Sequence, residues 1–557
     1  MKDQPLSRRG ASSTSTHNPN RRRLVGAIGI GIGGQLITGH VPGAAADPTT
    51  LTPSPISSNL SVSWLQPNLS GVKAAAKANL RIDAHAHFFN ASDVTVKGYL
   101  AGPVAHSFGP LGFLLKLLAP IADQLATIAP SAEEELAELE KKSRAFSGAP
   151  LAEISSKLES DRLVHQDIQS QRFYDFITGT EFEKAYNKLP PDGTGEKALQ
   201  TQTIQPTSMA QAMQAGELPS TENDLKPKTI PDGKPYKTGV LAFLGYFLSY
   251  RWTNLRTYQR TFTEREDSIK IDHVLASLVD FDHWLSGKVR SSHESQVILH
   301  AKLSELSNGY MRPLVGYNPW RDVKEPGAVL ALARRAIENH KFVGIKIYPP
   351  NGYFPWGNTE KVPKGPSAAE TNRALKGLWK LSDELNVPVM AHTNESMGSD
   401  PKHNRYGGPK GWRKLVDGYA KELNLKNPPL VNLGHFGGSG EDKKNIWTHE
   451  FADIMEKPGG SRIYGDLGYW TELGCGLVGA KKCEAAQKRL KKALDVKIEP
   501  GQTVANRVMY GSDWLMLSKE PNWDRYPNEL LESIQKIAPR SVDQIFGGNA
   551  QQCFGRI

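Results

Sequence analysis

The sequence predicts an α/β fold: a (β/α)8 TIM barrel with a long, mainly helical insertion after its first strand. Through the second half of the chain, short apolar runs alternate with amphipathic helical segments, which is the pattern of a parallel sheet covered by helices. Several of these runs end in His or Asp. Because α/β barrels carry their chemistry at the carboxyl ends of the strands, the same residues indicate where the site should lie.

Eight strands are expected in series along the chain. The first four cover residues 80–87, 274–280, 311–317 and 342–348, and the other four end near residues 392, 435, 466 and 513. Most are short runs rich in Val, Ile, Leu or Met, as strands buried on both faces of a sheet require. Amphipathic helices are expected at 328–340, 372–385, 412–423, 527–537 and 542–546.

The first and second strands are separated by an insertion far longer than an ordinary connection. We expect a linker at 47–79, the barrel at 80–94 and 266–557, and the insertion at 95–265. Helices are predicted within the insertion at 111–146, 153–178 and 240–262, and a loop at 187–238, which is rich in Pro, Gly, Thr and Gln. A lid, a dimerisation arm and a partner-docking surface all stay open as its role.

Residues 1–46 are typical of a bacterial export signal. Arg21 and Arg22 precede a Gly-rich stretch, 24–43, that has no Asp, Glu, Lys or Arg, and Ala44, Ala45 and Ala46 then form a small-residue cleavage site. The arginine pair is typical of twin-arginine signals. The stretch is too weakly apolar for a convincing membrane span. We therefore expect a periplasmic or secreted protein with no stable membrane span after removal of the signal.

Charge and composition argue against nucleic-acid binding. Much of the net charge of +10 comes from residues 1–46, which hold six Lys or Arg and one Asp. No basic face with interleaved aromatic residues is evident in the rest of the chain, as a nucleic-acid-binding protein would need. We expect a small-molecule substrate, and a homo-oligomer stays possible.

Three cysteines are too few for a scaffold built on disulfides. Cys475 and Cys483 lie eight residues apart and could form a bridge in an oxidising compartment. Cys553 has no obvious partner.

The most informative motif is the run Asp83-Ala84-His85-Ala86-His87 at the end of the first strand. Alternate side chains of a strand point the same way, so His85 and His87 are expected on one face with Asp83 behind them. Two imidazoles from one strand end can supply two ligands of a divalent metal ion. A His-x-His pair alone is weak evidence, because paired histidines also occur as ordinary core or surface residues.

Three more polar residues at strand ends support the metal site. His392, His435 and Asp513 each close an apolar run. From these positions we propose His85, His87, His392 and Asp513 as ligands of zinc or a similar divalent ion. Asp513 could also take a proton from an activated water, and His435 could stabilise an oxyanion or bind a second metal ion. One ion is expected, with two as the alternative.

Four further residues at strand ends are candidates for substrate binding: Lys346, Asn394, Asp466 and Tyr348. Lys346 has three possible roles. It could hold a substrate carboxylate, it could be carboxylated and bridge two metal ions, or it could simply order the mouth of the barrel. Burying an ammonium is costly, so one of these roles should explain its place in an apolar strand.

Together these motifs resemble those of the amidohydrolase superfamily, and more closely its second, amidohydrolase-related branch (family 2) of metal-dependent TIM-barrel enzymes. The matching segments are 82–87 (IDAHAH), 344–349 (GIKIYP), 389–392 (VMAH), 434–435 (GH), 510–514 (YGSDW) and 546–550 (FGGNA). The resemblance covers 80–90 and 270–555. It implies that His85, His87, His392 and Asp513 bind metal, and that His435 is catalytic or binds metal. The long insertion departs from the family pattern.

The resemblance implies a hydrolase or a non-oxidative decarboxylase. Our leading hypothesis is a metal-dependent hydrolase that cleaves a C–N or C–O bond of an amide, lactone or ester. A metal-dependent decarboxylase of an aromatic or unsaturated carboxylic acid is the alternative. A third reading is a non-catalytic periplasmic binding protein that keeps the barrel.

Overall fold

The computed structural model describes residues 64–67, 80–99, 126–178, 239–363, 365–396, 400–438, 447–520, 522–555 and 557. Within these ranges it confirms the barrel. The strands, in sheet order and in chain order, are β1 (Ile82–Ala86), β2 (His273–Ser277), β3 (Met311–Gly316), β4 (Gly344–Ile347), β5 (Val389–His392), β6 (Val431–Gly434), β7 (Ile463–Asp466) and β10 (Val508–Met509). All neighbouring strands of this sheet pair in parallel.

The barrel closes between its last strand and its first. The backbone N–H of Ala84 donates to the carbonyl of Tyr510 at 2.9 Å, and Ala86 forms a parallel bridge with Trp514. Although β10 spans only two residues, the chain continues alongside β1 beyond it. The closure therefore brings the segment that ends in Asp513 against the segment that holds His85 and His87.

The interior of the barrel is apolar below the site. Ile82, Leu275, Leu314, Met390 and Met509, from five different strands, belong to one buried cluster, together with residues of α22 (Asn549–Phe554). Inward-pointing side chains of this kind fill the interior of a TIM barrel, so that no pore remains. Polar side chains follow this layer at the carboxyl ends of the strands, so the site lies directly above a packed apolar core.

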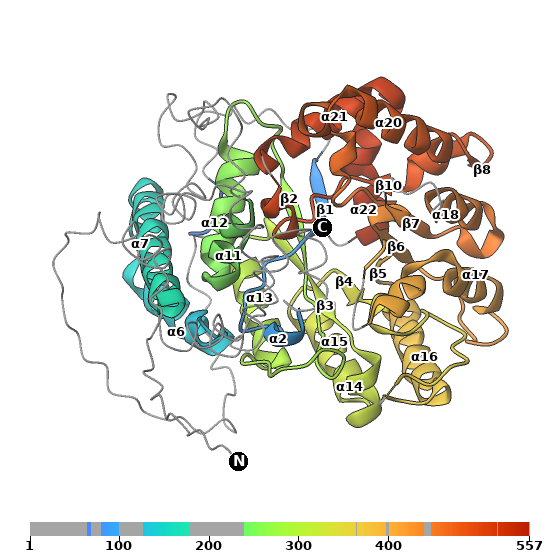
Figure 1. Cartoon of the computed structure of the whole chain (residues 1–557), viewed down its shortest axis with the longest axis horizontal. Coiled ribbons are helices and arrows are strands. Elements are labelled where there is room, and N and C mark those ends of the chain that lie inside the picture. Colours follow the sequence, from blue (N-terminus) through green and yellow to red (C-terminus); the bar gives the residue numbers. More distant parts are fainter. Residues whose placement is uncertain are drawn as a thin grey trace, which may run out of the picture.

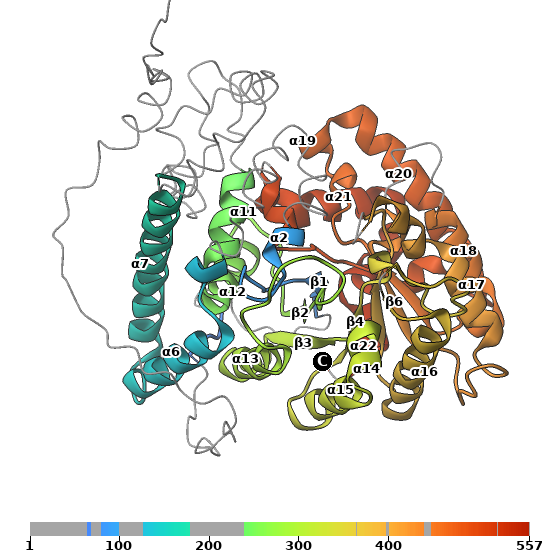
Figure 2. The ribbon, with the colours of Figure 1, turned by 60° about the horizontal axis from the view of Figure 1, so that its bottom comes forward.

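Helices surround the strands, as Figures 1 and 2 show. They are α13 (His293–Leu306), α14 (Pro319–Lys324), α15 (Ala328–Asn339), α16 (Ala368–Leu385), α17 (Pro409–Gly418), α18 (Trp447–Glu456), α19 (Cys475–Val478), α20 (Ala480–Leu494) and α21 (Tyr526–Ile537). The helix expected at 372–385 begins earlier, because Ser367 and Glu370 form a reciprocal capping box. The helix expected at 412–423 ends at Gly418. The segment expected at 542–546 is instead mostly π-helical, at Gln544–Gly548.

The described part of the insertion is helical. It contains α2 (Val96–Tyr99), α6 (Ala132–Ala145), α7 (Leu151–Thr178), α11 (Gly239–Leu248), α12 (Arg251–Gln259) and a π-helical turn, η5 (Arg260–Glu264). Helices α11 and α12 lie between α7 and the barrel in both views (Figures 1 and 2). No helix in the described ranges is long and apolar enough to cross a lipid bilayer.

Two expectations for the insertion need correction. The helix expected at 111–146 is interrupted within the described residues, because 126–128 are helical, 129–131 are not, and α6 begins at Ala132 after a capping box made by Ser131 and Glu134. Residues 100–125 and the expected loop at 187–238 lie outside the described residues. The single helix expected at 240–262 is divided at Tyr250. The buried carboxylate of Glu135 accepts hydrogen bonds from the N–H groups of Arg251 and Trp252, and so caps the start of a second helix.

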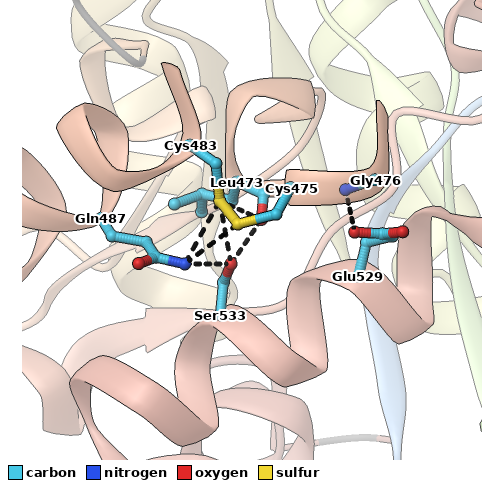
Figure 3. The surroundings of a disulfide bond; sticks show 7 residues. All are labelled: Leu473, Cys475, Gly476, Cys483, Gln487, Glu529 and Ser533. Atoms are coloured by element: carbon cyan, nitrogen blue, oxygen red, sulfur yellow. Dashed lines mark hydrogen bonds between the residues drawn. A yellow bond between two sulfur atoms is a disulfide. The ribbon is translucent and has the colours of Figure 1, made fainter. Parts of the chain in front are cut away.

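A disulfide joins Cys475 and Cys483, as expected, and staples α19 to the first turns of α20 (Figure 3). The amide of Gln487 donates to Ser533 Oγ beside it at 2.9 Å, and Glu529 accepts from the N–H of Gly476 at 2.8 Å. Cys553 is buried and unpaired. The bridge therefore fixes the segment that follows β7 against α20 and α21.

We predict that reducing this disulfide destabilises the protein without unfolding it. Closing a short loop contributes about 2.5 kcal/mol in the chain-entropy model, so dithiothreitol should lower the thermal midpoint of the wild type. The control is the double variant Cys475→Ser/Cys483→Ser, whose midpoint should already be low and should not respond to the reductant. An equal response of the two proteins would contradict a stabilising role for the bridge.

Candidate metal centre

Three side chains at the carboxyl end of the barrel direct ligand atoms toward one another. Nε2 of His85 lies 3.5 Å from Oδ1 of Asp513, and Nε2 of His87 lies 3.4 Å from the same oxygen. The three residues can each offer a ligand atom within 4.8 Å of the other two, and all three are buried. Two of them come from the end of β1 and one from the segment after β10, which the barrel closure brings together.

The hydrogen bonds of the two histidines turn lone pairs toward Asp513. Nδ1 of His85 donates to Oδ1 of Asp466 at 2.9 Å, and Nδ1 of His87 donates to the carbonyl of Ser277 at 2.8 Å. With the proton on Nδ1 of each ring, Nε2 carries a lone pair. Two lone pairs and a carboxylate oxygen then face one another, and of these acceptors Nε2 of His85 also receives the ammonium of Lys346 at 3.4 Å. This arrangement is unfavourable unless a cation lies among them.

The charge states and the spacing of these groups fit a divalent ion. Metal ligands must be deprotonated, and burial lowers the pKa of His85 well below its ordinary value. Burial alone would raise the pKa of Asp513, but a hydrogen bond from His87 and the positive charges of His85 and His435 lower it to about 2 when those rings are protonated. A tetrahedron with metal–ligand distances of about 2.1 Å has edges of roughly 3.4 Å, which matches the two Nε2–Oδ1 separations.

Asp513 is held in a backbone conformation that non-glycine residues rarely adopt. Its φ is 54°, and His435, Phe436 and Tyr469 at the ends of neighbouring strands also have positive φ. Such conformations persist only where the surroundings impose them. The N–H of Asp513 donates to the carbonyl of His85 at 2.6 Å, so the backbone carrying one ligand is bonded directly to the backbone carrying another.

His392 and His435 form a pair beside the three converging ligands. Nδ1 of His435 donates to the carbonyl of Gly468 at 2.8 Å, so its Nε2 accepts from Nδ1 of His392 at 3.0 Å. Nε2 of His392 then carries a lone pair, and it is buried without a hydrogen-bond partner among the described residues. An orphaned acceptor of this kind fits the ligand role predicted for His392, although the residue is not part of the tight three-atom group.

The same hydrogen bonds bear on the role expected of His435. An oxyanion needs a donor, but Nε2 of His435 is an acceptor in this arrangement. Burial also lowers the pKa of His435, which disfavours the doubly protonated ring. Its geometry therefore fits metal binding or proton acceptance better than oxyanion stabilisation.

Asp466 ends β7, as expected, and its contact with a substrate stays a prediction. It is fully buried. Its Oδ1 accepts from Nδ1 of His85 and from the N–H groups of His435 and Gly468, and its Oδ2 accepts from the amide of Asn432 at 2.8 Å. Both oxygens are thus bonded to protein groups. Asp466 orients His85, as carboxylates commonly do behind metal-binding histidines.

Lys346 is buried beside the ligands. Its Nζ lies 3.4 Å from Nε2 of His85, so it donates to the lone pair that would face a metal ion. Burial lowers its pKa to about 8, and the charges of Asp466 and Asp513 oppose that shift. The two chemical roles expected for Lys346, substrate binding and carboxylation, stay predictions.

Eight rings in successive contact form a closed circuit around this end of the barrel. In order they are His85, His87, Phe89, Tyr99, Phe281, Tyr348, His392 and His435. Sequence reasoning missed Phe89, Tyr99 and Phe281. Only Phe89 had a usable signal, since it continues the alternate spacing of the two histidines.

Of the other two predicted substrate-binding residues, Tyr348 belongs to the circuit, and Asn394 follows its member His392 by two positions. Tyr348 stacks on His392 with ring centroids 4.5 Å apart, and its hydroxyl hydrogen-bonds Ser396 at 2.9 Å. Asn394 accepts from the N–H of Glu395 and lies against Gly438 in the loop after β6. Substrate contact by either residue stays a prediction.

Asp83 does not share the face of the histidines as expected. Its Oδ2 accepts from the hydroxyl of Tyr258 at 2.6 Å, away from the converging ligand atoms. The pairing register of β1 shifts between Asp83 and Ala86, so the strict alternation behind the expectation is broken there.

Comparison with known families agrees with the resemblance of the motifs. A family model described as amidohydrolase matches residues 314–556. The match includes Lys346, His392, His435 and Asp513, and it begins after the first strand and the insertion. No curated protein matches the chain.

Solved structures give distant likenesses. They include a probable 2-pyrone-4,6-dicarboxylic acid hydrolase from Acinetobacter baumannii (11% identity, 51% of this chain and 84% of that one, TM-score 0.28). They also include a 2,6-dihydroxybenzoate decarboxylase from Rhizobium (12% identity, 54% of this chain and 92% of that one, TM-score 0.31). A third is an amidohydrolase from Burkholderia multivorans with bound zinc (14% identity, 51% of this chain and 84% of that one, TM-score 0.30). At these TM-scores the likenesses carry no argument about reaction or metal.

Proposed function

We propose, from the match of residues 314–556 to the amidohydrolase family model, that the chain is a metal-dependent hydrolase cleaving a C–N or C–O bond of an amide, lactone or ester. The observation that carries this proposal is the convergence of acceptor atoms from His85, His87 and Asp513. We include His392 as the fourth ligand because its Nε2 is buried with no hydrogen-bond partner in the part of the chain that the structure describes. Three imidazoles and one carboxylate suit a single zinc ion.

A divalent ion held by these residues supplies Lewis acidity and lowers the pKa of water. The residues of the chain do the rest. Asp513 stays ionised at neutral pH, so it can accept a proton from the attacking water and return it to the leaving group. Asp466 and the carbonyl of Ser277 fix the tautomers of His85 and His87. Lys346 places a cationic group within reach of a substrate anion.

The test is a substrate panel run on the zinc-loaded protein. Amides, lactones, esters and aromatic carboxylic acids are offered in water enriched in the heavy isotope of oxygen. Hydrolysis is expected, with one heavy oxygen in the product and no release of carbon dioxide. Carbon dioxide release without oxygen incorporation would instead make the chain a decarboxylase, and ligand binding without turnover would make it a binding protein. His87→Ala is the inactive control.

We also propose export to the bacterial periplasm, from residues 1–46, which lie outside the described residues. Arg21→Lys/Arg22→Lys should trap the chain in the cytoplasm of an expressing bacterium, because twin-arginine signals depend on this pair. The matched control changes the other arginine pair of the segment, Arg8→Lys/Arg9→Lys, which should leave export unchanged. Fractionation with immunodetection measures the result. Equal export of both variants would contradict the proposed signal.

A further inference from the structure

One side chain of the insertion contacts residues that are adjacent in the chain, or hydrogen-bonded, to the three converging ligands His85, His87 and Asp513. Tyr258, in α12, is fully buried. Its hydroxyl donates to Oδ2 of Asp83 at 2.6 Å across 175 positions of sequence. Its ring packs edge-on against Phe88 and Trp514, at centroid distances of 5.6 and 5.7 Å. Phe88 follows His87 directly in the chain, and Trp514 follows Asp513 directly.

Asp83 extends this support to the backbone of the site. Its Oδ1 accepts from the N–H of His85 at 3.0 Å and from the N–H of Ser512 at 2.9 Å. The first belongs to a ligand, and the second immediately precedes the ligand Asp513. A single carboxylate therefore ties the end of β1 to the segment after β10, and the hydroxyl of Tyr258 fixes that carboxylate from the other side.

The backbone held in this way needs such support. Asp513 has a left-handed φ of 54°, which a non-glycine residue keeps only when its surroundings over-determine it. The ladder is short at this point, since β10 ends at Met509. The N–H groups of His87 and Asp513 bond across the junction to Trp514 and His85, both at 2.6 Å. Asp83 and Tyr258 add the side-chain support on the side facing α12.

We propose that Tyr258 is a positioning residue for the metal centre, and that α12 of the insertion thereby forms part of that centre's framework. The hydroxyl orients Asp83, Asp83 holds the backbone of His85 and Ser512, and that backbone sets the spacing of His85, His87 and Asp513. This assigns the insertion a defined task at the site, separate from those of a lid, a dimerisation arm or a docking surface. The inference rests on the proposed metal centre.

Tyr258→Phe tests the inference, because it removes the hydroxyl and keeps the ring packing. The matched control is Tyr310→Phe. Tyr310 is also buried, its ring lies 6.4 Å from that of Tyr258, and its hydroxyl bonds Thr263 instead of Asp83. Each metal-free protein is titrated with zinc in competition with a chromophoric chelator, and its thermal midpoint is measured without metal.

Tyr258→Phe is expected to bind zinc roughly 10-fold more weakly than the wild type, as changes behind metal ligands typically do. Tyr310→Phe should bind like the wild type even where its midpoint falls by as much. Unchanged zinc affinity in Tyr258→Phe would overturn the inference and leave the proposed function intact. Absence of zinc binding by the wild type would overturn both.

A double-mutant cycle gives a second, independent test. Asp83→Ala cuts the same link from its other end, so it should also weaken zinc binding. Adding Tyr258→Phe to Asp83→Ala should then cause little further loss, because residues acting through one another are not additive. Fully additive losses of zinc affinity would show that Tyr258 does not act through Asp83, and would overturn the inference.

Discussion

Asp513→Asn is expected to abolish turnover and to weaken metal binding. Asp513 supplies the only carboxylate of the converging group found among the described residues, and its ionised form balances the charge of the ion. Asparagine is neutral and offers one weaker oxygen. Loss of proton transfer alone costs roughly 10²–10⁴-fold in rate, and loss of a direct ligand adds to that cost.

The measurement pairs turnover of a substrate from the panel with zinc affinity from chelator competition. Asp280→Asn is the control, because Asp280 is a buried carboxylate that pairs with Arg321 at 2.7 Å and is not among the converging ligands. It should change stability and leave zinc affinity near that of the wild type. Wild-type zinc affinity in Asp513→Asn would remove this residue from the ligand set.

Asp466→Asn is expected to weaken metal binding by roughly 10–100-fold, the range seen when the group behind a metal-binding histidine is changed. The carboxylate makes Nδ1 of His85 the donor, which leaves Nε2 free to bind metal. Burial raises the pKa of Asp466, and the donors around it stabilise the charge against that effect. An amide in its place weakens the hydrogen bond and lets His85 adopt the other tautomer.

Zinc titration of Asp466→Asn checks this expectation. The control is Asp322→Asn. Asp322 lies in α14, and its buried carboxylate accepts from the hydroxyl of Tyr317 and from the N–H of Gly327. A loss of zinc affinity equal to that of Asp322→Asn would mean that Asp466 contributes only to folding.

Sequence reasoning reached the barrel and most of the candidate ligands because both depend on local patterns. Strand ends closed by His or Asp placed His85, His87 and Asp513 at one edge of the sheet, and the structure brings them together. The same reasoning placed His392 at this edge. It could not show that Nδ1 of His392 is hydrogen-bonded to Nε2 of His435 beside the three converging ligands.

The contacts that sequence reasoning missed are long-range. Asp466 was recognised as a strand-end residue, but its bond to His85 joins positions 381 residues apart. Tyr258 lies in the helix expected at 240–262, but its link to Asp83 follows only from the way α12 docks on the barrel. The break at Tyr250 has the same origin, because the capping carboxylate of Glu135 comes from α6.

The most direct test of the central claim is the metal content of the purified chain, measured by elemental analysis beside a His87→Ala variant after both are supplied with zinc and dialysed. We expect about one zinc ion per wild-type chain. We expect none in the variant, because the substitution removes one of the three converging ligands. A wild type that retains no divalent metal, or a His87→Ala variant that retains as much as the wild type, would contradict the proposed metal centre.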